Sequence, residues 1–194
     1  MSRLFVTGDT HCNACGEFSK LNAKNFPQQK DLTKDDFVVI AGDFGLLWCG
    51  SSEERYWLDW MEDKPFTTLF VDGNHENHAM LADFPVEEWH GGKIHRIRQS
   101  IIHLMRGQVF EDIAGLRVFS MGGASSHDIQ DGILDPDDSF FEEEYRKLRR
   151  RGAMFRVKGQ TWWPEELPAE EEYAEAERNL DACGRKVDLI VTHC

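Results

Sequence analysis

The chain has 194 residues, of which 41% are hydrophobic, with 13 Phe and 6 Trp, so it can bury the core of one domain and is not a disordered chain. Its formal net charge of −13 argues against broad nonspecific binding to nucleic acid, because such binding depends on cationic contacts. No apolar run approaches the roughly 20 residues that span a membrane, and the N-terminus lacks signal-peptide architecture, so we expect a cytoplasmic protein without a membrane partner.

Three segments share one design, in which an apolar run leads through a glycine into polar residues. They are LFVTGDTH (4–11), FVVIAGDFG (37–45) and TLFVDGNHE (68–76). The apolar runs are rich in Val, Ile and Phe without strict alternation, which is typical of buried strands in a mostly parallel sheet. Between the second and third, residues 51–64 place aromatic side chains at helical spacing after a candidate N-cap, Ser51 or Ser52. Strand, helix and strand predict a βαβ unit.

The five cysteines predict no disulfide framework, because their number is odd and their spacing irregular. Cys12 and Cys15 form a C-x-x-C, but the chain has no second pair to complete a zinc ribbon. The pair also does not open a clear helix, as a thioredoxin-like redox site would. We therefore assign neither function to it.

The rest of the chain predicts hairpins, two helices and a last strand. Residues 94–126 contain short β-like runs broken by RG, AG and GG, which indicate antiparallel hairpins in a second sheet. Residues 136–152 and 164–184 indicate helices that stop at their final glycines. Residues 187–194, VDLIVTHC, predict a strand with His193 at its carboxyl end. No low-complexity linker divides the chain, so we expect a single domain.

The polar residues after the predicted strands indicate a metal site. Ligands of parallel sheets bind beyond the carboxyl ends of the strands, where glycines allow close backbone approach. The side chains expected to converge there are Asp9, His11, Asp43, Asn74 and His75. Together with a strand-end histidine, these carboxylate, amide and imidazole groups suit Mn, Fe, Zn or Ni, and one Asp can bridge two such ions. Turn and capping chemistry is the alternative role for these residues.

In order along residues 4–194, GDTH, GDFG, GNHE and VTHC resemble the motifs of the calcineurin-like metallophosphoesterases. The resemblance implies an α/β fold, a two-sheet α/β/β/α sandwich. It also implies hydrolysis of a phosphoric mono- or diester by water activated at a dinuclear metal centre. The implied cofactors are two divalent ions, with Mn²⁺ favoured over Fe, Zn, Ni or Mg. The implied substrate is a phosphorylated small molecule, a nucleotide or a phosphoprotein.

The same resemblance implies a role for each motif residue. Asp9 and His11 would ligate the first metal ion. Asp43 would bridge both ions, while Asn74 and His193 would ligate the second. His75 would contact the phosphate and protonate the leaving group, which suits an imidazole near neutral pH.

Two departures from the family pattern affect this interpretation. The final G-H-x-H is absent, because the sequence ends one residue after His193. We therefore expect under-coordinated metal ions in a truncated chain, and a catalytically dead binding or regulatory module is one alternative. The second departure is the lack of the arginines that phosphoprotein phosphatases and dinucleotide hydrolases carry beside these motifs, which counts against that narrower alternative. GGASSHDI (122–129) and WWPEELP (162–168) instead resemble uncharacterised bacterial and phage members.

Other polar and aromatic residues have two interpretations each. Glu76 is predicted to orient a neighbouring ligand. His127 could line the substrate cleft or lie on the surface. The basic run 146–152 could clamp a phosphate or form a solvated helix end, and Trp162 and Trp163 could stack on a ring or pack in the core.

Overall fold

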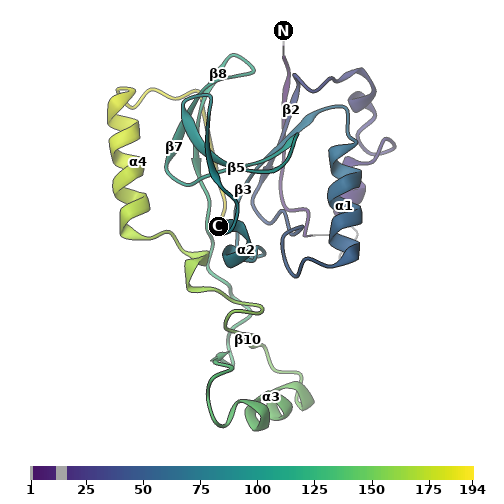
Figure 1. Cartoon of the computed structure of the whole chain (residues 1–194), viewed down its shortest axis with the longest axis vertical. Helices are drawn as coiled ribbons and strands as arrows, with labels where there is room; N and C mark the ends of the chain where they lie inside the picture. The colour runs from purple at the N-terminus through teal and green to yellow at the C-terminus, as the bar shows by residue number, and fades with distance from the viewer. Residues whose placement is uncertain (1, 12–16) are drawn as a thin grey trace.

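The computed structural model describes residues 2–11 and 17–194, so Cys12 and Cys15 lie outside the described residues. Figure 1 shows the body of the protein as layers, with α1 (Ser52–Glu62) and α4 (Glu170–Ala182) on opposite outer faces of two packed sheets. A smaller segment that contains α3 (Phe141–Arg150) extends away from this body. The expected α/β/β/α sandwich is the architecture observed.

The larger sheet has six strands in the order β1-β2-β3-β6-β5-β4. Strands β1, β2, β3 and β6 run parallel to one another. Strand β5 runs antiparallel to β6, and β4 runs antiparallel to β5. Their bounds are Leu4–Thr7 for β1, Phe37–Ala41 for β2, Thr67–Val71 for β3, Val86–Trp89 for β4, Gly92–Arg98 for β5 and Ile101–Leu104 for β6. The βαβ prediction is confirmed, since α1 (Ser52–Glu62) connects the paired strands β2 and β3, and the Ser51 side chain caps it by accepting from the Glu54 N–H.

One expectation about this sheet is wrong. The β5–β6 hairpin extends the first sheet instead of belonging to the second, because Thr68, Leu69 and Phe70 pair with residues 101–103. Strand β4 was not predicted from its sequence, VEEW, which carries two acidic residues and forms the sheet edge. Charged residues are common on such edges because they discourage pairing with other chains.

The smaller sheet has the order β11-β8-β7. Its strands are β7 (Gln108–Ile113), β8 (Leu116–Met121) and β11 (Leu189–Thr192). β7 and β8 form the predicted hairpin, and both residues of its two-residue loop, Ala114 and Gly115, have positive φ, as tight hairpin turns require. The predicted last strand, β11, pairs in parallel with β8 and brings His193 to its carboxyl end.

Two hydrophobic clusters explain why the predicted strands lack alternation. On β2, Val38 and Ile40 face the helical layer, where they join Leu58 and Met61 of α1 in one buried cluster. Phe37 and Val39 face the other way and join buried residues of both sheets. Both faces of β2 are therefore covered, so apolar residues are favoured at every position.

Both C-terminal helices begin later than predicted. Helix α3 (Phe141–Arg150) follows turns in which the Asp135 and Asp138 side chains accept backbone N–H groups. Helix α4 (Glu170–Ala182) follows the 3-10 turn η4 (Pro164–Glu166) and a proline at 168. Their predicted stops hold, since Gly152 and Gly184 both have a φ of +64°. α4 packs on the smaller sheet, where the Asn179 side chain donates to the Gly107 carbonyl at 2.7 Å.

The projecting segment in Figure 1 is formed by residues 127–162, which we call the arm. It contains β9 (Ile133–Leu134), α3 and β10 (Arg156–Val157), and β9 pairs with β10 in parallel. The remaining short helices are η2 (Glu17–Leu21), η3 (Pro27–Asp31) and α2 (His78–Ala82).

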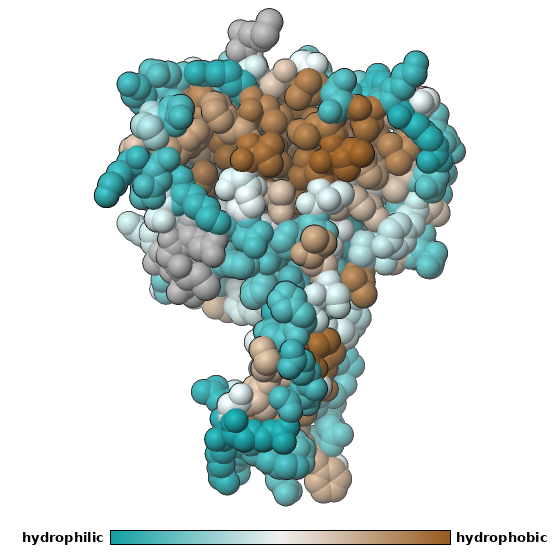
Figure 2. Space-filling model, turned by 180° about the vertical axis from the view of Figure 1, so that it is seen from behind, coloured by the Kyte–Doolittle hydropathy of each residue, from teal (hydrophilic) through white to brown (hydrophobic). Residues whose placement is uncertain are grey.

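One face of the body is apolar. Figure 2 shows a broad hydrophobic surface on the upper part of the molecule when it is seen from behind. Among the described strands, β1 pairs only with β2 and β11 only with β8, so each has an open edge. Val6 on β1 and Ile190 on β11 are 54% and 60% exposed. These edges can accept a further strand.

A buried ion-pair network joins the two sheets where their parallel strands end. Asp72, directly after β3, accepts hydrogen bonds from Arg106 Nε at 2.8 Å and from His103 Nε2 at 3.1 Å. Its backbone carbonyl accepts from the N–H of Gly123, which follows β8, at 2.8 Å. Burial alone would raise the pKa of Asp72, but His103 and Arg106 lower it overall. The charged Asp72 carboxylate and its backbone therefore hold the two sheets together.

Replacing Arg106 tests the contribution of its buried ion pair with Asp72. Arg106→Met leaves the Asp72 carboxylate buried without its cation, so we expect the free energy of unfolding to fall by about 3–5 kcal/mol. Arg117→Met removes an exposed partner of Glu111 and is the control, with an expected loss of at most about 1 kcal/mol. Urea unfolding followed by fluorescence measures both values. Equal losses in the two variants would contradict a structural role for the buried pair.

Candidate metal centre

Asp43 lies at the centre of the candidate site, directly after β2. Its side chain is buried, with the residue 4% exposed. Oδ2 accepts from His11 Nε2 at 2.7 Å, and Oδ1 lies 3.3 Å from His193 Nε2. Oδ1 also accepts from the His75 backbone N–H at 3.0 Å. One carboxylate thus contacts loops that follow β1, β3 and β11.

The backbone around Asp43 is strained. Asp43 has a φ of +50° and His11 a φ of +41°, in the left-handed region that is uncommon for residues other than glycine. The Asp43 carbonyl accepts from the N–H groups of Thr10 and His11, both at 2.9 Å, which holds the loops after β1 and β2 together. Strained conformations of this kind concentrate at functional sites, where the surrounding structure holds them.

Asp9 and His193 complete this group of side chains. Asp9 Oδ2 lies 3.7 Å from His11 Nε2, and Asp9 Oδ1 lies 3.9 Å from His193 Nδ1. His193 Nδ1 donates to the Ala41 carbonyl at 2.8 Å, which fixes the ring and directs Nε2 toward Asp43. Its hydrogen bond to Asp43 outweighs burial and raises the pKa of His193 to about 9, so a metal ion has to displace that proton.

Asn74 and His75 follow β3. The Asn74 side-chain amide, in a residue 6% exposed, donates to Ser126 Oγ at 3.4 Å, which leaves its oxygen available as a ligand. Ser126 is held in turn by Glu166, to which its hydroxyl donates at 2.7 Å. The His75 ring lies 4.7 Å from the His11 ring between centroids and stacks on Trp48 at 6.2 Å. Burial lowers the pKa of His75.

Glu76 orients the loops that carry these groups. Its fully buried carboxyl group, whose pKa burial raises to about 8, accepts from the backbone N–H of Gly73 at 2.6 Å and of Gly45 at 3.1 Å. The loops after β2 and β3 are therefore fixed relative to each other. This is the orienting role that the sequence predicts for Glu76.

Two glycines allow the strand ends to approach this closely. A Cβ on Gly42 would lie 2.0 Å from the His193 ring, and one on Gly73 would lie 2.1 Å from Asp43 Oδ1. No larger residue fits either position without displacing a proposed ligand. Gly8, in the corresponding position after β1, has open space instead.

The donor set fits divalent metal ions. Two protein ligands of one ion stand roughly 3 Å apart, because each metal–ligand bond is about 2.1 Å long. His11 Nε2 lies 2.7 Å from Asp43 Oδ2 and 3.7 Å from Asp9 Oδ2, and His193 Nε2 lies 3.3 Å from Asp43 Oδ1. One ring nitrogen each from His11 and His75 and a carboxylate oxygen of Asp43 also lie within 4.8 Å of one another. Burial would raise the pKa of Asp43, but His193 and His11 lower it overall, so it is a charged ligand.

The structure therefore brings all six predicted site residues to one end of the sheets, where Asn74 and His75 stand beside the other four. His127 is exposed, as its surface interpretation expects. In the basic run, Arg146 and Lys147 pair with acidic residues of α3 itself, which agrees with a solvated helix end. Trp163 is 5% exposed and packs edge-on against Trp48, 5.2 Å between centroids, as its core interpretation expects.

Sequence reasoning missed Arg156. This residue of the arm is buried, and its Nη2 lies 3.3 Å from His75 Nε2. Its strand, β10, is only two residues long, which is too short to show a periodic pattern. No motif surrounds Arg156 in the sequence either. Only the folding of the arm onto the body places it in the site.

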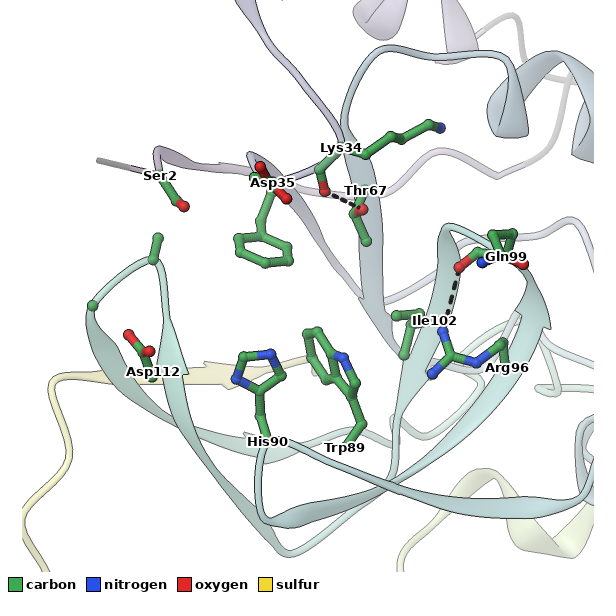
Figure 3. Close-up of a pocket in the computed structure, with 13 residues that line it drawn as sticks. Ser2, Lys34, Asp35, Thr67, Trp89, His90, Arg96, Gln99, Ile102 and Asp112 are labelled. Atoms are coloured by element: carbon green, nitrogen blue, oxygen red, sulfur yellow. Dashed lines mark hydrogen bonds between the residues drawn. The ribbon is translucent and has the colours of Figure 1, made fainter.

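A separate cavity of about 770 Å³ is lined by other residues (Figure 3). Phe37 and Thr67, which line it, are the first residues of β2 and β3, so it opens at the other end of the sheet. Trp89 and His90 lie side by side on its wall, with ring centroids 4.1 Å apart. None of the predicted site residues lines it.

A known family matches almost the whole chain. The family model described as calcineurin-like phosphoesterase matches residues 2–192. No curated protein and no solved structure matches the chain. In the described part of the chain, no helix is both long and apolar enough to cross a bilayer.

Gly73→Ala tests the close approach at the metal centre. The added Cβ would overlap Asp43 Oδ1 and the His193 ring, so we expect Mn²⁺ affinity to fall at least about tenfold through displaced ligands. Gly8→Ala makes no such contact and is the matched control with unchanged affinity. Isothermal titration with Mn²⁺, beside circular dichroism to verify folding, measures this. Unchanged affinity in a folded Gly73→Ala protein would contradict the proposed ligand arrangement.

Proposed function

The chain belongs to the calcineurin-like phosphoesterases, a family that hydrolyses phosphoesters with divalent metal ions, and from this premise we propose that it does so with a dinuclear centre. In this proposal Asp9 and His11 would hold one ion, and Asn74 and His193 would hold the other. Asp43 would contact both. Mn²⁺ is the favoured metal, and the substrate is a phosphoric mono- or diester.

The observation that carries this proposal is the position of the Asp43 carboxylate. Its two oxygens face different histidines, His11 on one side at 2.7 Å and His193 on the other at 3.3 Å. A carboxylate with one ligand group beside each oxygen has the geometry of a bridge between two ions, which in two-metal hydrolases stand about 3.5–4 Å apart. The half-buried Asp9 lies between the same two histidines.

The chain's own residues supply binding, orientation and a proton. When bound, the ions polarise phosphoryl oxygens and lower the pKa of bound water toward neutrality. His75 is fixed by its stacking on Trp48 and by its backbone hydrogen bond to Asp43. Because burial lowers the pKa of His75, its protonated imidazole is a stronger acid and donates readily to a leaving oxygen.

The substrate we propose is a phosphorylated small molecule, a nucleotide or a phosphoprotein. The site is reached from the surface, since the Asp9 side chain is 42% exposed and the His11 side chain 24%.

Three described cysteines, Cys49, Cys183 and Cys194, are free thiols, which suits action in the reducing cytoplasm.

Asp43→Asn tests the bridge. The amide keeps the shape of the side chain but removes its charge, so we expect the protein to bind fewer Mn²⁺ ions and to lose hydrolysis of bis-p-nitrophenyl phosphate. Metal analysis of the purified protein and the release of nitrophenolate measure the two effects, and EDTA should abolish the wild-type reaction. A wild-type protein that holds under about a tenth of an ion per chain after Mn²⁺ loading would overturn the enzyme proposal and favour a binding module.

His75→Asn tests the proton donor separately from metal binding. Because His75 is proposed to act on the leaving group, we expect kcat to fall by roughly 100-fold or more while metal content is retained. His90→Asn changes an exposed histidine at the other end of the sheet and should leave kcat unchanged. A folded, metal-loaded His75→Asn protein with wild-type kcat would remove His75 from the mechanism.

A further inference from the structure

We propose that Arg156 of the arm binds the phosphoryl oxygens of the substrate, so that the arm contributes a residue to the active site. The inference rests on the proposed function, because it places the phosphoryl group beside His75. It concerns a residue outside the sequence motifs. The arginines sought beside GNHE and after the second motif are absent from those positions, and the arm supplies one by another route.

Arg156 is held rigidly before any substrate arrives. The residue is 5% exposed, and its Nε donates to Asp128 Oδ1 at 2.7 Å. Its Nη1 donates to the carbonyls of Asn74 at 3.0 Å and Thr161 at 3.1 Å. These contacts fix the plane of the guanidinium, so little conformational entropy remains to be lost when it binds an anion.

The remaining nitrogen faces the site. Nη2 lies 3.3 Å from His75 Nε2, and within the described residues no carboxylate or carbonyl accepts from it. His75 in turn stands next to His11 and Asp43. The guanidinium therefore presents an N–H₂ group with no anionic partner, held by the His75 ring alone, beside the imidazole that we place on the phosphoryl group.

The charge balance around Arg156 also favours an anion. Its one ion-pair partner among the described residues is Asp128, whose side chain is 44% exposed and contacts Nε. On the His75 side the buried cation meets only an imidazole, which carries no negative charge. A phosphoryl oxygen there would supply the missing negative partner, in the geometry that arginine and phosphate prefer.

A purely structural role would account for only part of these contacts. Asp128, Asn74 and Thr161 fasten the base of the arm to the body through Nε and Nη1. They do not involve Nη2, whose partner is the His75 imidazole in the candidate site. The basic run on α3 is a weaker candidate for phosphate, because Arg146 and Lys147 already pair within their own helix.

The test is isothermal titration of the Mn²⁺-loaded protein with inorganic phosphate. We compare wild type with Arg156→Met, Arg156→Lys and the control Arg150→Met, which removes an exposed charge from the same arm. The Kd for phosphate should rise about tenfold or more in Arg156→Met and less in Arg156→Lys, which keeps the charge but loses the planar fork. Arg150→Met should bind phosphate like wild type.

Hydrolysis provides a second readout. Arg156→Lys should raise KM for bis-p-nitrophenyl phosphate more than it lowers kcat, with metal content and melting temperature unchanged. If Arg156→Met does not fold, Arg156→Lys alone decides. Wild-type phosphate affinity in folded Arg156 variants would overturn the proposal, and so would a wild-type protein that does not bind phosphate. Phosphate binding that depends on Arg156 without any metal-dependent hydrolysis would support this inference while refuting the proposed function.

Discussion

The rest of the structure depends on the shared contacts of one buried carboxylate. Asp43 meets His11, the His75 backbone and His193, which follow three different strands of two sheets. Such an arrangement is possible only if the strands end at the same place and their backbones nearly touch. Positive φ angles at His11 and Asp43 and the absence of a side chain at Gly42 and Gly73 are the local costs of that approach. The packed sandwich around them offsets these costs.

Buried ionisable groups just behind the ligands hold the neighbouring loops together. Asp72 is held by Arg106 and His103, and Glu76 bonds the backbones of Gly45 and Gly73. Buried ionisable groups contribute little net stability, but removing one partner is costly because the other is left unpaired. Moving one of these loops would break buried hydrogen bonds, so each group restrains the loops that it joins. The ligand loops are rigid for this reason, although they are irregular in conformation.

The sequence predicted features that depend on neighbouring residues and missed features that depend on distant ones. The three strand–glycine–polar units and α1 were predictable because apolar runs, glycines and a serine cap are local signals. The sequence did not predict which sheet the β5–β6 hairpin joins. Apolar residues such as Ile101 and Ile102 suit either sheet, and the choice depends on pairing with the distant strand β3. Arg156 was missed for the same reason, since its role depends on contacts with Asn74 and His75, more than 80 residues away.

The charges of the site imply an order of events for the proposed reaction. The chain carries a net charge of −13, and Asp9 and Asp43 stand where a phosphoryl group would bind. Arg156 and the protonated His193 only balance these two carboxylates, so the site without metal has no excess positive charge to attract a phosphate anion. Bound divalent ions are the largest local charges in such a site and reverse its potential. Bound metal ions would therefore strengthen phosphate binding by giving the site a net positive charge, and the role proposed for Arg156 is to orient the anion that they attract.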